Sequence, residues 1–140
     1  MTISLDHIGI AVADLAAVKK LYSLLGLQVG HVESVPSEGL KAHFLTLPPV
    51  ETHLELLVSE NPESTMAKFI AKRGPGIHHL SFRVENGRLD PLCDQLRREG
   101  YRLIYDSPQT GAQKMRVNFI HPAASGGVLI ELSEPLESDG

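Results

Sequence analysis

The order of elements predicted for the first half of the chain is predicted again for the second half. In each half an alternating apolar strand precedes a helix, which ends at a glycine, and three further strands follow. Gly26 and Gly100, which end the two helices, are 74 residues apart, and His7 and His79 on the leading strands are 72 apart. Two unrelated α+β halves of similar length would show similar offsets, but residues on the strands favour a duplicated module.

Apolar spacing and breaker residues set the bounds of these elements. Asp14 stands at the N-cap position of the first helix, and Gly74, Pro75 and Gly76 separate the halves. The predicted strands are 5–12, 27–35, 40–47, 52–58, 77–84, 101–105, 116–120 and 127–132, and the predicted helices 15–25, 65–72 and 90–99. We expect one domain over residues 4–134, with module one at about 4–60, a linking helix at about 64–73, module two at about 76–134, and an acidic tail at 135–140.

Composition excludes several classes of protein. With 140 residues and a net charge of -4, the chain can bury one core but shows no overall basic excess for nucleic acid or an anionic membrane. Cys93 is the only cysteine, so no intramolecular disulfide and no paired-cysteine metal motif can form. The sequence has neither an apolar run long enough to span a membrane nor a signal-peptide pattern at Met1. We expect a cytoplasmic protein.

Four polar side chains interrupt the apolar alternation of the strands. His7 and His79 lie near strand starts, while Glu55 and Glu131 each stand between two apolar residues of a later strand. Two imidazoles and two carboxylates on one sheet surface would suit Co, Zn, Mn, Ni or Fe. Any one of them is more simply a solvated or structural residue, so the residues leave both interpretations open. The remaining histidines are interpreted as structural or supporting: His31, His43, His53, His78 and His121.

Several stretches carry a resemblance to a known family. They are DHIGIAV at 6–12, LELL at 54–57, EST at 63–65, GIHHLSF at 76–82, YDSP at 105–108, NFIHP at 118–122 and GGVLIEL at 126–132. Over nearly its whole length the chain resembles the vicinal oxygen chelate superfamily, which has the glyoxalase and bleomycin-resistance fold. Within it, the chain is similar to the methylmalonyl-CoA epimerase family, chiefly through residues 63–65 and 121–132.

The resemblance implies an α+β fold in which two tandem βαβββ modules form a U-shaped, cup-like mixed sheet. It places the metal ligands at His7, Glu55, His79 and Glu131, with Glu131 also catalytic. It implies an isomerase that interconverts (2R)- and (2S)-methylmalonyl-CoA by proton abstraction at C2, with a divalent metal ion, often cobalt, stabilising the enolate. It also implies an acyl-CoA substrate as partner and a homodimer.

One position departs from that pattern. Many relatives carry a second glutamate on the strand after the 36–39 turn, where this chain has Ala42. Strand alternation points the adjacent His43 to the other face, so Glu38 or a metal-held water would have to act. The basic residues near the expected site edges, for which plain solvation is the simpler role, are Lys68, Lys72, Arg73, Lys114 and Arg116. A lactoylglutathione lyase and a non-catalytic, ligand-sequestering protein of the same fold remain alternatives.

Overall fold

The computed structural model describes residues 3–46 and 51–136, which divide between two compact units. The first unit is residues 7–78, and the second comprises the residues up to Asp6 together with those from His79 onward. The unit boundaries lie within strands β1 (Ile3–Ala11) and β5 (Gly76–Val84). The predicted strand end at Pro48 and Pro49 lies outside the described residues.

The first unit builds a four-stranded sheet in the order β2-β3-β4-β1. It contains α1 (Leu15–Leu24), β2 (Gln28–Val35), a 3-10 turn over Pro36–Glu38, β3 (Leu40–Thr46), β4 (His53–Ser59) and α2 (Thr65–Arg73). β1 pairs with β4 in parallel, and the other neighbours are antiparallel. Every helix and strand predicted in this unit is confirmed to within a few residues at its ends in the described ranges.

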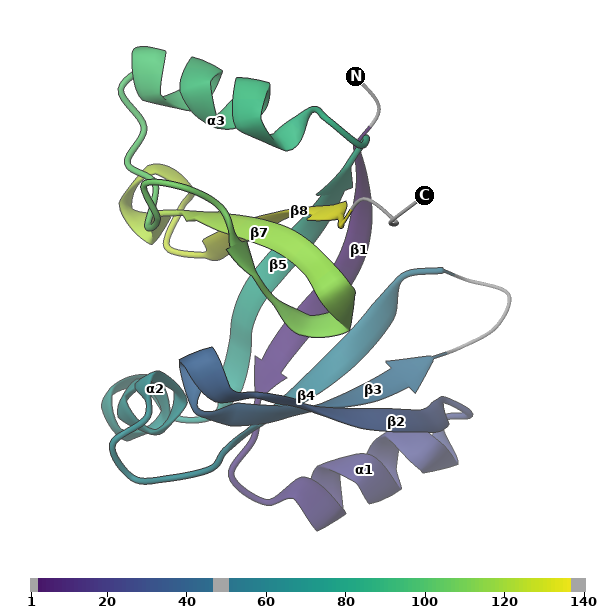
Figure 1. The fold of residues 1–140 in the computed structure, drawn as a ribbon. Coiled ribbons are helices and arrows are strands. Elements are labelled where there is room, and N and C mark those ends of the chain that lie inside the picture. The colour runs from purple at the N-terminus through teal and green to yellow at the C-terminus, as the bar shows by residue number, and fades with distance from the viewer. Residues whose placement is uncertain (1–2, 47–50, 137–140) are drawn as a thin grey trace. The chain divides into compact units, whose positions relative to one another are not determined.

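Helix α1 covers one face of this sheet (Figure 1). The Asp14 carboxylate accepts a hydrogen bond from the Ala17 amide at 3.2 Å, which satisfies an otherwise unpaired donor of the first turn. Leu15, Val18 and Tyr22 then pack on a cluster built around Val12, Leu45 and Leu56. Because side chains alternate along a strand, the opposite face of β1 and β4 carries His7, Gly9 and Glu55.

The second unit repeats this plan with the strand order β5-β8-β7-β6. Its further elements are α3 (Leu89–Arg98), β6 (Gln109–Thr110), β7 (Met115–Ile120) and β8 (Leu129–Pro135). Leu89 and Cys93 of α3 pack against Val84 and Leu132, so this helix also covers one face of its sheet (Figure 1). The other face carries His79, Ser81 and Glu131.

The registers of the two parallel strand pairs match. Gly9 lies opposite Glu55 in the β1–β4 pair, and Ser81 lies opposite Glu131 in the β5–β8 pair. In both pairs the residue opposite the glutamate lies two positions after the predicted histidine ligand: Gly9 follows His7, and Ser81 follows His79. The two βαβββ modules predicted from the sequence are therefore confirmed as an α+β fold with a true internal repeat.

The predicted strand at residues 101–105 is wrong. The structure has a single bridge there, between Leu103 and Ile120, and the short strand β6 comes later. The side chain of Asn118 replaces a regular ladder, since its Oδ1 accepts from the Tyr105 amide at 3.1 Å and its Nδ2 donates to the Tyr105 carbonyl at 3.0 Å. A residue-by-residue apolar pattern cannot reveal such a side-chain substitute for backbone pairing.

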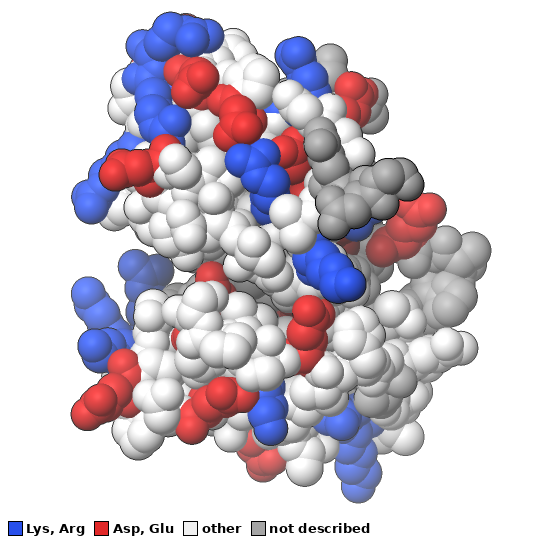
Figure 2. All heavy atoms as spheres, in the orientation of Figure 1, with Lys and Arg blue, Asp and Glu red and all other residues white. Residues whose placement is uncertain are grey.

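Between the Leu103 bridge and β7, the chain contains β6 and a 3-10 turn over Ala112–Lys114. Pro135, assigned to the tail, ends β8 opposite Met115. Among the described residues no helix is long and apolar enough to cross a membrane. Figure 2 shows acidic and basic side chains interspersed over the face drawn.

Candidate metal centre and active site

His7 and Glu55 meet on the uncovered face of the first unit. His7 precedes Gly9 by two residues on β1, and Gly9 is paired with Glu55 on β4, so both side chains project from the same face. His7 Nδ1 lies 2.9 Å from Glu55 Oε2. Both residues are buried, Glu55 to 4% exposure. This contact brings together the histidine and the glutamate that the sequence singles out in the first half.

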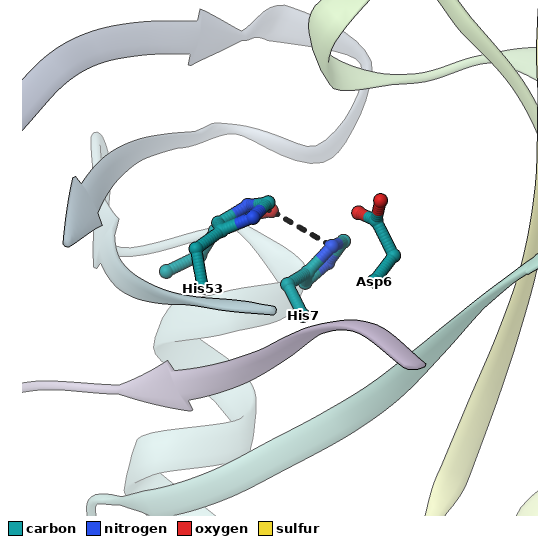
Figure 3. A group of neighbouring side chains, drawn as sticks. Asp6, His7 and His53 are labelled. Carbon is teal, nitrogen blue, oxygen red and sulfur yellow. Dashed lines mark hydrogen bonds and ion pairs between the residues drawn. The ribbon is translucent and has the colours of Figure 1, made fainter. Parts of the chain in front are cut away.

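A third residue, His53, joins this pair. Its Nε2 is also 2.9 Å from Glu55 Oε2, and its ring stacks on that of His7 with centroids 5.2 Å apart (Figure 3). Phe44 packs against the outer side of His53, and His31 stacks on Phe44 at 4.3 Å. From the sequence, His53 is interpreted as structural or supporting, although its spacing of two residues from Glu55 on one strand places both side chains on the same face.

His79 and Glu131 form the second pair, within the second unit. A ligand atom of His79 and one of Glu131 lie within 4.8 Å of each other. Phe119, which is paired with Glu131 on the neighbouring strand, meets the His79 ring edge to face at 6.4 Å. Each unit thus brings together its own predicted histidine and glutamate.

The donor atoms of these pairs fit a divalent metal ion. Neutral imidazole nitrogen and carboxylate oxygen are the usual ligands of Zn, Co, Ni, Mn and Fe in proteins. Burying two carboxylates is costly unless positive charge or donors compensate it, which a bound cation would do. Ser81 Oγ is fully buried on the strand next to Glu131 and has no hydrogen-bond partner among the described residues, so this face of the second unit also suits a group that brings further polar atoms.

The structure distinguishes between the residues around the position where many relatives carry the second glutamate. Ala42 is buried on the same face of β3 as Phe44, the partner of Glu55, so a methyl group occupies that place. His43 is paired with Leu56 and points to the opposite face. Glu38 ends the 3-10 turn, and its pKa is raised first by burial and then by the negative charge of Glu55. Glu38 is therefore the candidate for the second proton-transfer group, because it lies near enough to Glu55 for the Glu55 charge to affect its pKa.

Two further predicted residues have structural roles. Arg116 contacts Glu134 through Nη1 and Asp90 through Nη2, the latter at 3.2 Å, so its guanidinium is already engaged by carboxylates. His78 meets Phe69 edge to face at 4.7 Å, and burial lowers its pKa to about 4, which keeps it neutral near pH 7. Neither residue belongs to the histidine–glutamate pairs.

Residues 6–119 match the family model described as the Glyoxalase/Bleomycin resistance protein/Dioxygenase superfamily. The ethylmalonyl-CoA/methylmalonyl-CoA epimerase of Cereibacter sphaeroides is 36% identical over 133 residues, which cover 93% of this chain and 96% of that protein.

Two solved structures have the same fold over nearly all of both chains. Methylmalonyl-CoA epimerase from Mycobacterium tuberculosis is 42% identical with a TM-score of 0.86, and the match covers 95% of this chain and 88% of that one. A methylmalonyl-CoA epimerase in complex with methylmalonyl-CoA and NH4+ is 32% identical with a TM-score of 0.85, with coverage of 97% and 96%.

The match to the family model spans residues 6–119, most of the chain. The chain belongs to the Glyoxalase/Bleomycin resistance protein/Dioxygenase superfamily. Its relatives there include proteins named methylmalonyl-CoA epimerase, and the resemblance noted in the sequence is confirmed by these similarities.

Proposed function

We propose that this protein is a metal-dependent methylmalonyl-CoA epimerase, an isomerase acting on an acyl-CoA thioester. The observation that carries the proposal is the pair of buried histidine–glutamate contacts, His7 with Glu55 and His79 with Glu131, in a chain similar to epimerases over nearly its full length. Following the family resemblance, the proposal includes that both pairs hold a single ion.

His7, Glu55, His79 and Glu131 would hold the divalent ion, for which we propose cobalt first and Zn, Mn, Ni or Fe as alternatives. When bound, this ion supplies Lewis-acid stabilisation of negative charge on the substrate oxygens. The buried setting of the four residues strengthens such electrostatic effects, because water is excluded from the face they occupy.

Glu131 moves the proton in this proposal. Its carboxylate takes the hydrogen from C2, and the C–H electron pair passes into the thioester carbonyl to give the enolate. Inversion then requires proton delivery to the opposite face of C2, after which the enolate electrons form the new C–H bond. We assign that delivery to Glu38, because burial favours its protonated form and Ala42 has no proton to give.

The test is exchange of the C2 hydrogen with solvent. The protein loaded with Co²⁺ is incubated with one epimer in deuterated water, and deuterium at C2 and conversion to the other epimer are measured by NMR. We expect both with the metal and neither after chelation. Absence of exchange above the metal-free control, or turnover of methylglyoxal with glutathione instead, would overturn the proposal.

Changing Glu38 to Gln should separate exchange from inversion. The amide keeps the shape of the side chain but cannot deliver a proton, so interconversion should fall by about 10²-fold. Exchange without inversion should persist for the epimer whose C2 hydrogen faces Glu131. Glu51→Gln, an exposed change in the same unit, is the matched control and should leave both rates unchanged. If Glu38→Gln interconverts the epimers at the original rate, another group delivers the second proton.

We also propose that the protein acts as a cytoplasmic homodimer. The lone Cys93 is buried and reduced, which suits a reducing compartment. Leu21, Leu24 and Leu25 at the end of α1 are each more than half exposed, and such neighbouring apolar side chains favour a protein contact. Light scattering would report twice the 15.3 kDa of one chain for the dimer.

A further inference from the structure

We propose that His53 is a metal ligand, so that His7, His53 and Glu55 form a three-donor group for a divalent transition-metal ion within residues 7–78. The inference deepens the proposed function, on which it rests for the presence of the ion. The superfamily pattern in the sequence placed only His7 and Glu55 at the metal in this unit, and His53 adds a second imidazole.

The distances match neighbouring positions in a metal coordination shell. His7 Nδ1 and His53 Nε2 are each 2.9 Å from the same atom, Glu55 Oε2. Two ligands at right angles on bonds of about 2.1 Å are separated by about 3.0 Å. The three donor atoms also lie within 4.8 Å of one another, as ligands of one ion must. Only small shifts would be needed to place all three around a cation.

The surroundings hold His53 in this place. It follows the strand alternation that puts Glu55 on the same face, and it is the direct partner of His7 in the parallel ladder. Phe44 packs on one side of its ring and His7 stacks on the other. The side chain is only about one-tenth exposed, so its polar nitrogens need partners inside the protein. This packing preorganises the ring for ligation.

The two units differ at this point. In the second unit the residue opposite His79 is Leu129, whereas in the first unit the residue opposite His7 is His53. The first unit therefore offers two nitrogen donors and one oxygen, and the second offers one of each. A set richer in imidazole favours Co, Ni and Zn over Mg or Mn. Ligation through Nε2 needs the tautomer of His53 with hydrogen on Nδ1, because a nitrogen that binds a metal ion cannot also carry a hydrogen.

The decisive measurement uses the unaltered full chain. With ¹⁵N-labelled histidine and ¹¹³Cd²⁺ as probe, a directly bonded nitrogen shows a ¹¹³Cd–¹⁵N coupling. We expect this coupling at Nε2 of His53 as well as at His7. A folded protein that binds Cd²⁺ without coupling to His53 overturns the proposal, even if His53 affects affinity, because a residue that only orients Glu55 would show none.

Affinity measured by chelator competition with Zn²⁺ gives the second readout. His53→Gln should weaken binding by at least about 10-fold, whereas His31→Gln, a change at the histidine stacked on the far side of Phe44, should leave it within 2-fold of the original. Equal affinities for the two variants would contradict ligation by His53. The two proposals can fail separately. If metal binds through His53 but no exchange of the C2 hydrogen is observed, the epimerase proposal is wrong and ligation by His53 still holds.

Discussion

Epimer interconversion by the Glu131→Gln variant is expected to be about 10²–10⁴-fold slower than by the original protein. Glu131 is buried on β8 next to His79, where its carboxylate is assigned the transfer of the C2 proton. The amide retains one oxygen for the metal ion but cannot take up a proton. The rate is measured by NMR with each epimer as the starting substrate in deuterated water.

Two controls separate the loss of the base from loss of the fold or of the ion. Glu99→Gln changes an exposed residue of the same unit and should leave the rate unaltered. Metal content of the Glu131→Gln variant, measured by mass spectrometry after dialysis, should remain detectable. A fully loaded variant that interconverts the epimers at the original rate shows that Glu131 is not the base.

Removing the Glu134 side chain is expected to destabilise the protein by about 3 kcal/mol. This buried carboxylate accepts from the amides of Gly87 and Leu89 at 2.9 and 3.2 Å, at the start of α3, and it also pairs with Arg116. Glu134→Ala leaves the two amides and the guanidinium without that acceptor. For a chain of this length the melting temperature should fall by about 10 °C, as measured by circular dichroism.

Asp90→Ala is the matched control, because Asp90 is the other partner of Arg116 but is largely exposed. An exposed ion pair contributes about 1 kcal/mol or less, so this variant should melt within a few degrees of the original. If the two variants lose equal stability, the buried amide contacts of Glu134 contribute little and the effect comes from the charge on Arg116.

Much of the candidate site was predictable because a strand has a repeat of two residues. The apolar neighbours of Glu55 and Glu131 identify the face that turns away from the helix, and the structure places both carboxylates there. Because the order of elements repeats, the same reasoning identifies the face that turns away from the helix in each half. Caps and breakers were equally local signals, as Asp14 at the start of α1 shows.

His53 and Tyr105 show two features that the pattern of neighbouring residues cannot predict. His53 has the same two-residue spacing from Glu55 on any strand, but its contact with the site depends on β1 lying beside β4 in one particular register. Tyr105 lies in an apolar segment typical of a strand, yet the side chain of Asn118 bonds its backbone in place of a ladder. In both cases the partner is distant in sequence.

The sequence by itself determined the order of helices and strands, the covered face of each strand and the presence of one histidine and one glutamate in each half. These follow from short-range periodicity and capping, which depend on residues a few positions apart. Only the tertiary structure decided that His7 and His53 contact the same oxygen of Glu55, and that Glu38 lies near enough to Glu55 for its charge to raise the Glu38 pKa. The physical reason is that strand register and the path of a turn are set by packing between distant segments.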